Sequence, residues 1–220
     1  SAASDVYKRQ SQDHKRAYDG DKGPNTGGMG AYSPVPQIGQ DVVDTAIETI
    51  VKPTVQAMSD EGTPFTGILY AGLIATADGP KVIEFNARFG DPETEVVLPK
   101  LTSDLGAGIS ALLNGETPEF TWDNDNATLG VVLAADGYPV DVIKGAAIPE
   151  IPVDEDSHVY YAGVARSEEG LVANSGRVLL VETSAADIKA AQDKVYAIID
   201  QLDTKGMFYR HDIGAKALNI

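Results

Sequence analysis

KVIEFNARFGDPET, residues Lys81–Thr94, passes from an apolar strand pattern to a polar, turn-forming segment. Lys81–Asn86 (KVIEFN) is rich in the β-branched and aromatic residues that favour strands. The stretch before it, Thr66–Thr76 (TGILYAGLIAT), has the same character, and Ala77–Pro80 (ADGP) between them is a turn sequence. The sequence therefore predicts a β-hairpin that ends in a run of polar side chains.

Three of those polar side chains are expected on one face. Side chains alternate across a strand, so Glu84, Asn86 and, if the strand continues, Arg88 point the same way. A carboxylate, an amide oxygen and a cation suit a hard divalent metal that bridges phosphate oxygens, with Arg88 neutralising charge on a transferred phosphoryl group. The alternative is an ordinary half-exposed strand with a surface Glu–Arg pair.

Two further segments could contact an anion. Gly23–Gly30 (GPNTGGMG) could cradle one with backbone N–H groups, although it matches neither a Walker A loop nor a Rossmann fingerprint. The alternative is a flexible loop. A helix that begins at Asp91-Pro92 would offer its free N–H groups. Alternatively the Asp91 carboxylate caps that helix, and both could hold in one structure.

In the C-terminal part of the chain the strand patterns come first and a helical pattern follows, which predicts a small α+β unit. The expected elements before the polar boundary segment Gly115–Asn126 are a strand end at Ser11–Ala17, a long loop at Asp19–Pro36, a helix at Asp41–Asp60 interrupted at Pro53, and a helix at Ser103–Leu113 closed by Asn114-Gly115. Those after it are strands at Leu129–Ala135, His158–Arg166 and Arg177–Glu182 and an amphipathic helix at Ala185–Leu202.

Composition excludes several classes of function. The 220 residues carry 17 Lys and Arg against 33 Asp and Glu, a net charge of −16, which argues against nucleic acid and anionic membranes as partners. The absence of cysteine excludes disulfides, thiolate zinc sites and a cysteine nucleophile. The three histidines, which show no metal-ligand spacing, are expected to be structural.

The first ten residues, SAASDVYKRQ, differ in character from the rest of the chain. Asp5–Gln10 looks like the translation of a sequencing adaptor, so we expect Ser1–Gln10 to be a non-native leader. The alternative is a natural flexible N-terminus.

Several stretches resemble the phosphoribosylamine–glycine ligase family, also called glycinamide ribonucleotide synthetases. The resemblance covers Ser11–Ile220, and Glu95 stands where the family usually has Gln. The stretches are SQDHKRAYDGDKGPNTGGMGAYSPVP, TGILYAGL, VIEFNARFGDPETE, LGVVLAADGYP, YYAGVA, NSGRVLLV and RHDIGAKAL.

The resemblance implies both a fold and a reaction. Residues 11–120 would be the C-terminal half of an ATP-grasp domain, an antiparallel sheet with helices, and residues 121–220 a small α+β C-terminal domain. The implied enzyme is a cytoplasmic monomer of purine biosynthesis. It joins glycine to 5-phosphoribosylamine with conversion of ATP to ADP, by way of glycyl phosphate.

The resemblance also implies site residues. Glu84 and Asn86 would bind Mg²⁺ or Mn²⁺, and Arg88 would be catalytic, in contact with the transferred phosphate. Relatives often carry a further carboxylate on the preceding strand, where Tyr70–Leu73 has none. The segments expected to face phosphoribosylamine and glycine comprise Asp13, Gly27, Gly28, Met29, Gly90, Asp91, Pro92, Glu93 and Thr94.

The parts of the family that hold adenine and cover the ATP phosphates have no counterpart in this sequence, so the nucleotide-binding residues stay unknown. We therefore expect a ligase fragment that is inactive alone. The alternative is a non-catalytic binding module derived from the same fold. Retention of Glu84, Asn86 and Arg88 argues against it, because such a module has no chemical need for all three.

Overall fold

The computed structural model describes residues 10–219, so all of the predicted leader except Gln10 lies outside the described residues. The chain forms two compact units that interleave along the sequence. The first unit contains Pro36–Gly90 and Leu101–Trp122. The second contains Gln10–Val35, Asp91–Lys100 and residues 123–219. The chain returns to the second unit within the predicted boundary segment, and the division into family domains at residue 120 stays a prediction.

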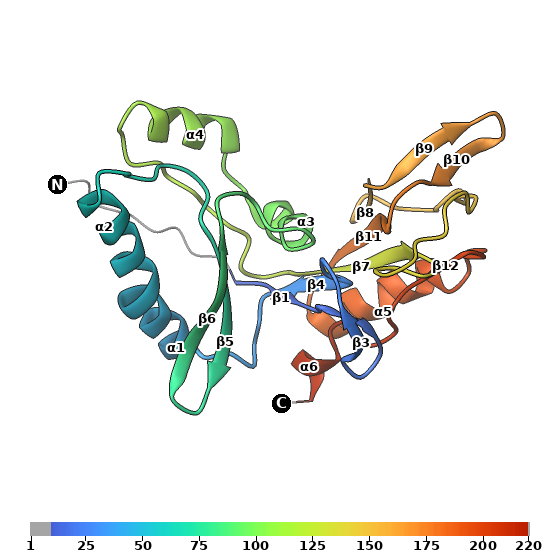
Figure 1. Ribbon diagram of the computed structural model, residues 1–220, viewed down its shortest axis with the longest axis horizontal. Coiled ribbons are helices and arrows are strands. Elements are labelled where there is room, and N and C mark those ends of the chain that lie inside the picture. Colours follow the sequence, from blue (N-terminus) through green and yellow to red (C-terminus); the bar gives the residue numbers. More distant parts are fainter. Residues whose placement is uncertain (1–9, 220) are drawn as a thin grey trace. The chain divides into compact units, whose positions relative to one another are not determined.

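The second unit is built on an antiparallel sheet, which has six strands among the described residues. Its order is β1-β4-β7-β11-β8, with β12 also paired to β7. Figure 1 shows β4, from the start of the chain, beside β7 from the second half. The strands are β1 (Gln12–Asp13), β4 (Gly30–Ser33), β7 (Ala127–Ala135), β11 (Arg177–Ala185), β8 (Ser157–Tyr161) and β12 (Met207–Phe208).

Strand β7 and helix α5 (Ile188–Ile199) contribute buried residues to the core of this unit. Every residue of β7 is buried, as its apolar sequence predicts for a central strand. Helix α5 begins after Asp187, whose carboxylate accepts a hydrogen bond from the Ala190 N–H at 2.8 Å. Its buried stripe, Ile188, Ala191, Val195 and Ile198, packs on the sheet, which confirms the predicted amphipathic helix.

The predicted long loop at Asp19–Pro36 is wrong. The segment contains β3 (Lys22–Asn25), paired with β2 (Arg16–Tyr18), and then β4, whose residues Ala31 and Tyr32 are fully buried. Glycine enables this close pairing, because a Cβ at Gly30 would lie 2.6 Å from the Gly130 carbonyl oxygen.

Two predicted strands divide into shorter ones. Ser11–Ala17 contributes to both β1 and β2. His158–Arg166 forms β8 and then β9 (Val164–Ser167), which pairs instead with β10 (Gly170–Ala173). The break falls at Gly163, where a Cβ would lie 2.5 Å from the Ser175 Cβ. Short helices α3 (Thr94–Val97), a 3₁₀ turn (Leu98–Lys100) and α6 (Ala215–Leu218) complete the second unit.

The first unit contains the predicted hairpin, β5 (Tyr70–Thr76) and β6 (Gly79–Asn86), which is confirmed. The predicted helix at Asp41–Asp60 is interrupted, as expected. It forms α1 (Gln40–Ala46), a π-helical turn (Ile47–Val51) and α2 (Lys52–Asp60), with Pro53 in the first turn of α2. Helix α4 (Leu105–Leu113) ends at Asn114, before Gly115 at φ +76°, as predicted.

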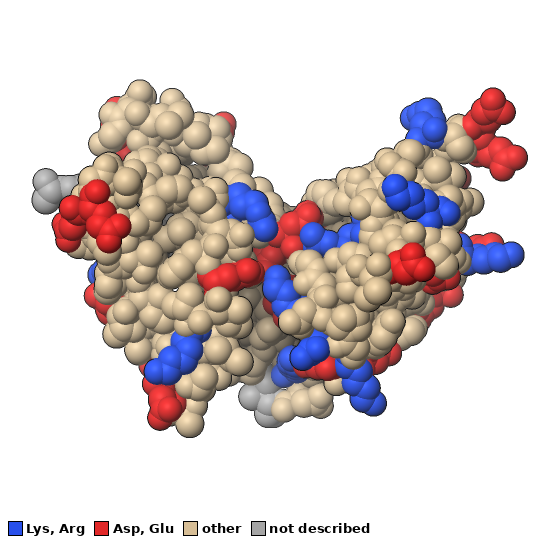
Figure 2. Space-filling model, in the orientation of Figure 1, with Lys and Arg blue, Asp and Glu red and all other residues tan. Residues whose placement is uncertain are grey.

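The β5–β6 hairpin exposes apolar side chains. Ile83 is 66% exposed, and Ile74, Val82 and Phe85 are exposed too. Figure 2 shows a surface over these strands that carries few charged side chains. A two-stranded sheet is marginal by itself, so this hairpin depends on packing against other elements. Among residues 10–219, no helix is long and apolar enough to cross a membrane.

Candidate functional site

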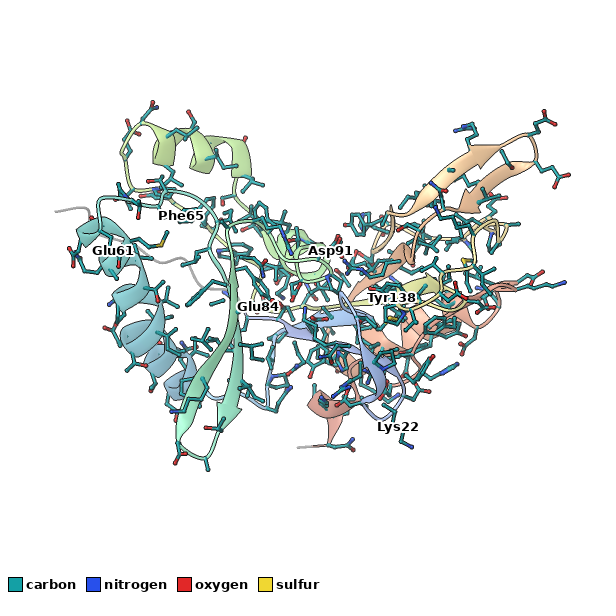
Figure 3. All side chains as sticks on the ribbon, viewed as in Figure 1. Lys22, Glu61, Phe65, Glu84, Asp91 and Tyr138 are labelled. Carbon is teal, nitrogen blue, oxygen red and sulfur yellow. The ribbon has the colours of Figure 1, made fainter. Side chains whose placement is uncertain are left out.

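The end of β6 presents the predicted metal-binding residues. Glu84 and Asn86 are two apart in the strand and share a face, with Gly72 and Tyr70 of β5 as their cross-strand partners. A Cβ at Gly72 would lie 3.1 Å from the Glu84 Cγ, so the absence of a side chain there gives Glu84 its room. Figure 3 labels Glu84 on this strand.

Arg88 follows the end of β6 and folds back toward Asn86. Its Nη1 donates to the Phe89 carbonyl oxygen at 2.7 Å, and its Nη2 lies 3.5 Å from the Asn86 Oδ1. The structure thus brings a guanidinium group beside an amide oxygen, and the carboxylate shares the strand face with that amide.

The donor set at the end of β6 fits a metal ion that is bound mainly by phosphate oxygens and water rather than by the protein. Within residues 10–219, no cluster of three or more acidic or histidine side chains could hold a metal by itself. One carboxylate and one amide oxygen are hard donors, which is the protein contribution expected for Mg²⁺ bound mainly through phosphate oxygens and water. Glu84 and Asn86 are therefore suited to a metal that arrives with a nucleotide.

The predicted substrate-facing residues belong to the second unit, except Gly90, which belongs to the first. A Cβ at Gly28 would lie 2.6 Å from the Asp13 Oδ1 and 2.4 Å from the Pro92 Cδ. Asp13, Gly28 and Pro92 are thus in close contact, and only glycine fits at residue 28, which has φ +124°. We call this group of segments, residues 13, 26–29 and 91–94, the loop platform.

The backbone of the glycine-rich segment does not form an open anion cradle. Its N–H groups bond within the protein: Thr26 to the Lys15 carbonyl at 2.7 Å, Gly27 to the Tyr138 hydroxyl at 2.9 Å, and Gly28 to the Thr26 hydroxyl at 3.0 Å. These three donors are already used within the protein, so residues 26–28 do not form the predicted cradle. Within residues 26–29, which these bonds hold in place, Gly27 is the exposed residue.

Met29 belongs to the core rather than to the exposed wall. Its side chain is fully buried, its N–H donates to the His14 carbonyl, and its own carbonyl accepts from the Val132 N–H. A substrate on the loop platform would meet Gly27 rather than Met29.

The predicted helix start at Asp91-Pro92 is also wrong. Helix α3 begins at Thr94 with Glu93 at its N-cap position, and it has four residues. Asp91 does not cap it, because the Asp91 carboxylate forms an ion pair with Arg177, with its Oδ1 2.7 Å from the Arg177 Nη1. Figure 3 labels Asp91, which belongs to the loop platform, and Tyr138, whose hydroxyl accepts from the Gly27 N–H.

Arg177 and Tyr138 are the site residues that sequence reasoning missed. Arg177 lies inside NSGRVLLV and Tyr138 inside LGVVLAADGYP, two stretches that carry the family resemblance. An arginine that opens an apolar, buried strand was the available signal, because such a cation needs acceptors from elsewhere in the chain.

A cavity of about 720 Å³ opens beside α3 in the second unit. Thr94, Glu95 and His158 line it, and burial raises the pKa of Glu95. The His158 Nδ1 lies 2.9 Å from the Oε2 of the fully buried Glu182. This contact orients the imidazole, and the structural role expected of the histidines stays a prediction.

Asp13 and His14 are neighbours whose pKa values shift in opposite directions. Burial, and next the charge of Glu93, raise the pKa of Asp13 to about 6, although Lys15 at 2.5 Å opposes the shift. Burial, and next Arg210 and Lys216, lower the pKa of His14 to about 4. His14 is 1% exposed and contacts Tyr32, with ring centroids 5.7 Å apart.

These two shifts have opposite effects on how stability depends on pH, and single substitutions separate them. Neutral Asp13 stabilises the fold below its ordinary pKa of 3.8, and that contribution is lost as pH rises through 6. Neutral His14 stabilises it above 6.5, and that contribution is lost as pH falls toward 4. In Asp13→Asn the free energy of unfolding should therefore rise by about 3 kcal/mol from pH 4 to 6.5.

The complementary variant should show the opposite slope. In His14→Gln the free energy of unfolding should fall by about 2 kcal/mol from pH 4 to 6. Urea denaturation at half-unit pH steps measures both, with the exposed Asp78→Asn as the control that keeps the parent's profile. Parallel profiles for Asp13→Asn, His14→Gln and the parent would contradict the prediction.

Comparison with known protein families gives two matches in chain order. The model described as "Phosphoribosylglycinamide synthetase, ATP-grasp (A) domain" matches residues 4–94. The model described as "Phosphoribosylglycinamide synthetase, C domain" matches residues 128–216. Together with the antiparallel sheets, these matches confirm the predicted fold class, part of an ATP-grasp domain followed by a C domain.

Individual relatives belong to the same family as the two matched models. A phosphoribosylamine–glycine ligase of Streptococcus pyogenes serotype M18 is 57% identical over 209 residues, 94% of this chain and 49% of the relative. The Lactococcus lactis ligase is 57% identical over 208 residues, 94% of this chain and 50% of the relative. The crystal structure of the Thermotoga maritima ligase has a TM-score of 0.80 and 36% identity, over 92% of this chain and 50% of that one. The chain thus spans about half the length of these relatives.

Proposed function

Because the chain belongs to the phosphoribosylamine–glycine ligase family, we propose that it supplies the metal-binding strand and part of the substrate wall of such a ligase. The observation that carries the proposal is the pair of matches to two domains of one family, in chain order. The proposed substrates are ATP, glycine and 5-phosphoribosylamine.

The reaction needs two bond exchanges. A glycine carboxylate oxygen attacks the γ-phosphorus of ATP, ADP leaves, and glycyl phosphate forms. The phosphoribosylamine nitrogen then attacks the glycyl carbonyl carbon, the C–N bond forms, the C–O bond to phosphate breaks, and the nitrogen loses a proton. Phosphate is the better leaving group, which is why the carboxylate is phosphorylated first.

The residues at the end of β6 act on the first step. A Mg²⁺ ion on Glu84 and Asn86 would screen the negative charge of the ATP phosphates. Arg88 supplies a fixed cation with several donors, which can stabilise charge that develops on the phosphoryl oxygens as the bond to ADP breaks. Its contact with the Phe89 carbonyl holds the guanidinium in place before the substrate binds.

The loop platform acts on the substrates that carry amines. Asp91 is its exposed carboxylate, and a carboxylate is a suitable acceptor for an ammonium or amine group. Gly27 is the exposed backbone of the loop platform, and the Arg177 guanidinium fills the space on its side-chain side. The proposed role of both is to hold glycine or phosphoribosylamine while the bonds change.

The test uses a chimeric ligase, in which this sequence replaces the 209 matched residues of the Streptococcus pyogenes relative. The chimera should release phosphate from ATP only when glycine and phosphoribosylamine are both present. The isolated chain should release none, because positioning and electrostatics supply nearly all the catalysis of phosphoryl transfer and this sequence shows no nucleotide-binding segment.

Both arms can contradict the proposal. A folded chimera without activity would mean that this chain has lost the ligase chemistry, as a non-catalytic binding module would. Phosphate release by the isolated chain that depends on both substrates would mean that the whole site lies within these residues. The unmodified relative, purified in the same way, is the positive control.

A further inference from the structure

Arg177 is the first residue of β11, and four oxygen atoms lie within hydrogen-bond distance of its Nη1. Its Nη1 lies 2.7 Å from the Asp91 Oδ1 and 2.9 Å from the Asp91 carbonyl oxygen. The same nitrogen lies 3.2 Å from the carbonyl oxygen of Gly27 and 3.5 Å from that of Gly28. These contacts join segments that are 86 to 150 residues away from Arg177 in the sequence.

The glycine-rich segment lies directly against the guanidinium. A Cβ at Gly27 would be 2.9 Å from both the Cζ and the Nη2 of Arg177, closer than real Cβ contacts. The Arg177 side chain is 23% exposed, so solvent screens these contacts only in part.

The chemistry of the partners explains why an arginine stands here. Three carbonyl oxygens and a carboxylate oxygen converge, and all of them are acceptors, so they repel one another unless a cation with several donors lies between them. The N–H groups of Thr26 and Gly27 are held by Lys15 and Tyr138, but those bonds leave the carbonyl side of the segment to Arg177.

We propose that Arg177 is a positioning residue that fixes Gly27 and Gly28 against Asp91 and so forms the loop platform before substrate binds. Arg177 acts through these residues rather than on the reacting atoms. The inference rests on the proposed function for its effect on substrates. A preformed wall lowers the ordering cost of binding, so losing it weakens substrate binding more than it slows the chemical step.

Hydrogen exchange on the full 220-residue chain tests the positioning role without any need for activity. In Arg177→Met the amides of residues 26–29 should exchange at least about tenfold faster, while those of β7 keep the parent's rates. Arg177→Lys should restore part of the protection, because it keeps the charge but has no planar fork. Arg166→Met, at an exposed arginine of β9, is the matched control and should change neither region.

Asp91→Asn gives a second variant in case Arg177→Met does not fold. It removes the negative partner and keeps the carbonyl contacts, so exchange at residues 26–29 should quicken less than in Arg177→Met. Parent-like exchange of those amides in a folded Arg177→Met, or in Asp91→Asn where the former does not fold, would overturn the proposal.

Kinetics in the chimeric ligase separate positioning from simple stability. Arg177→Met should raise the KM for glycine or for phosphoribosylamine about tenfold and leave kcat and the KM for ATP near the parent's. Faster exchange with both of those KM values unchanged would overturn the positioning role. An inactive parent chimera would count against the proposed function, and the exchange result would still decide whether Arg177 orders the loop platform.

Discussion

Replacing Arg88 with lysine should lower the kcat of the chimeric ligase by about 100-fold while the KM for ATP stays close to the parent's. The substitution keeps the positive charge and removes the planar fork. In the structure both terminal nitrogens of the guanidinium have a protein partner: Nη1 donates to the Phe89 carbonyl oxygen, and Nη2 lies near the Asn86 Oδ1. A lysine ammonium cannot keep a backbone anchor and meet phosphoryl oxygens with the same geometry.

The expected loss falls on kcat because the charge that Arg88 meets grows in the transition state. Steady-state kinetics with ATP varied, at saturating glycine and phosphoribosylamine, measures the effect. Arg166→Lys is the matched control, because it makes the same change at an exposed position of β9. An unchanged kcat with a raised KM for ATP would show that Arg88 binds the ground state, and its proposed role would be wrong.

Elements that depend on local pattern could be predicted from the sequence. The β5–β6 hairpin follows from two strand-forming runs around a short turn, and α5 follows from the spacing of Ile188, Ala191, Val195 and Ile198. Asp187 marks the start of α5 with an ordinary N-cap. In each case the residues that form the element are close in sequence, so its signal is complete within one window.

Elements that depend on distant partners could not be predicted. Gly30–Ser33 has the composition of a loop, and it is a strand because it pairs with the adjacent strand β7, with Tyr32 opposite Leu129. Asp91 followed by Pro92 has the appearance of a helix start, but its carboxylate is taken by Arg177, 86 residues away. The partner of Asp91 is therefore one that only the folded chain brings near.

The candidate site also has parts that the local sequence predicts and parts that depend on distant residues. Glu84 and Asn86 share a strand face, which two-residue alternation predicts without further information. The glycine-rich segment misled the sequence argument, because the occupancy of its N–H groups depends on Lys15 and Tyr138. Glycine indicates where the backbone is approached closely, but it does not indicate which atom approaches.

The second large effect is expected at the proposed metal ligands. Glu84→Gln removes the single full negative charge of the donor set and keeps the shape of the side chain. The Mg²⁺ concentration for half-maximal activity of the chimeric ligase should rise by on the order of tenfold or more, with a lower kcat. Asn86→Ala should act in the same direction but less, by about threefold, because it removes a neutral dipole rather than a charge.

Magnesium titrations of activity for the parent and both variants measure these shifts, and Glu61→Gln, at the exposed end of α2, is the matched control. Electron paramagnetic resonance of Mn²⁺ gives a readout that does not need turnover. Protein-bound Mn²⁺ should require a non-hydrolysable ATP analogue in the parent, because two protein ligands hold a metal weakly by themselves. It should decrease in Glu84→Gln at the same analogue concentration.

The relative sizes of the Glu84→Gln and Asn86→Ala effects distinguish two roles for Asn86. If charge dominates, Glu84→Gln exceeds Asn86→Ala. If Asn86 matters mainly by orienting Arg88, whose Nη2 lies 3.5 Å from its Oδ1, then Asn86→Ala lowers kcat and leaves the magnesium curve in place. Superimposable magnesium curves for all the variants and the parent would mean that Glu84 and Asn86 are only the polar face of a strand. The proposed metal site at the end of β6 would then be wrong.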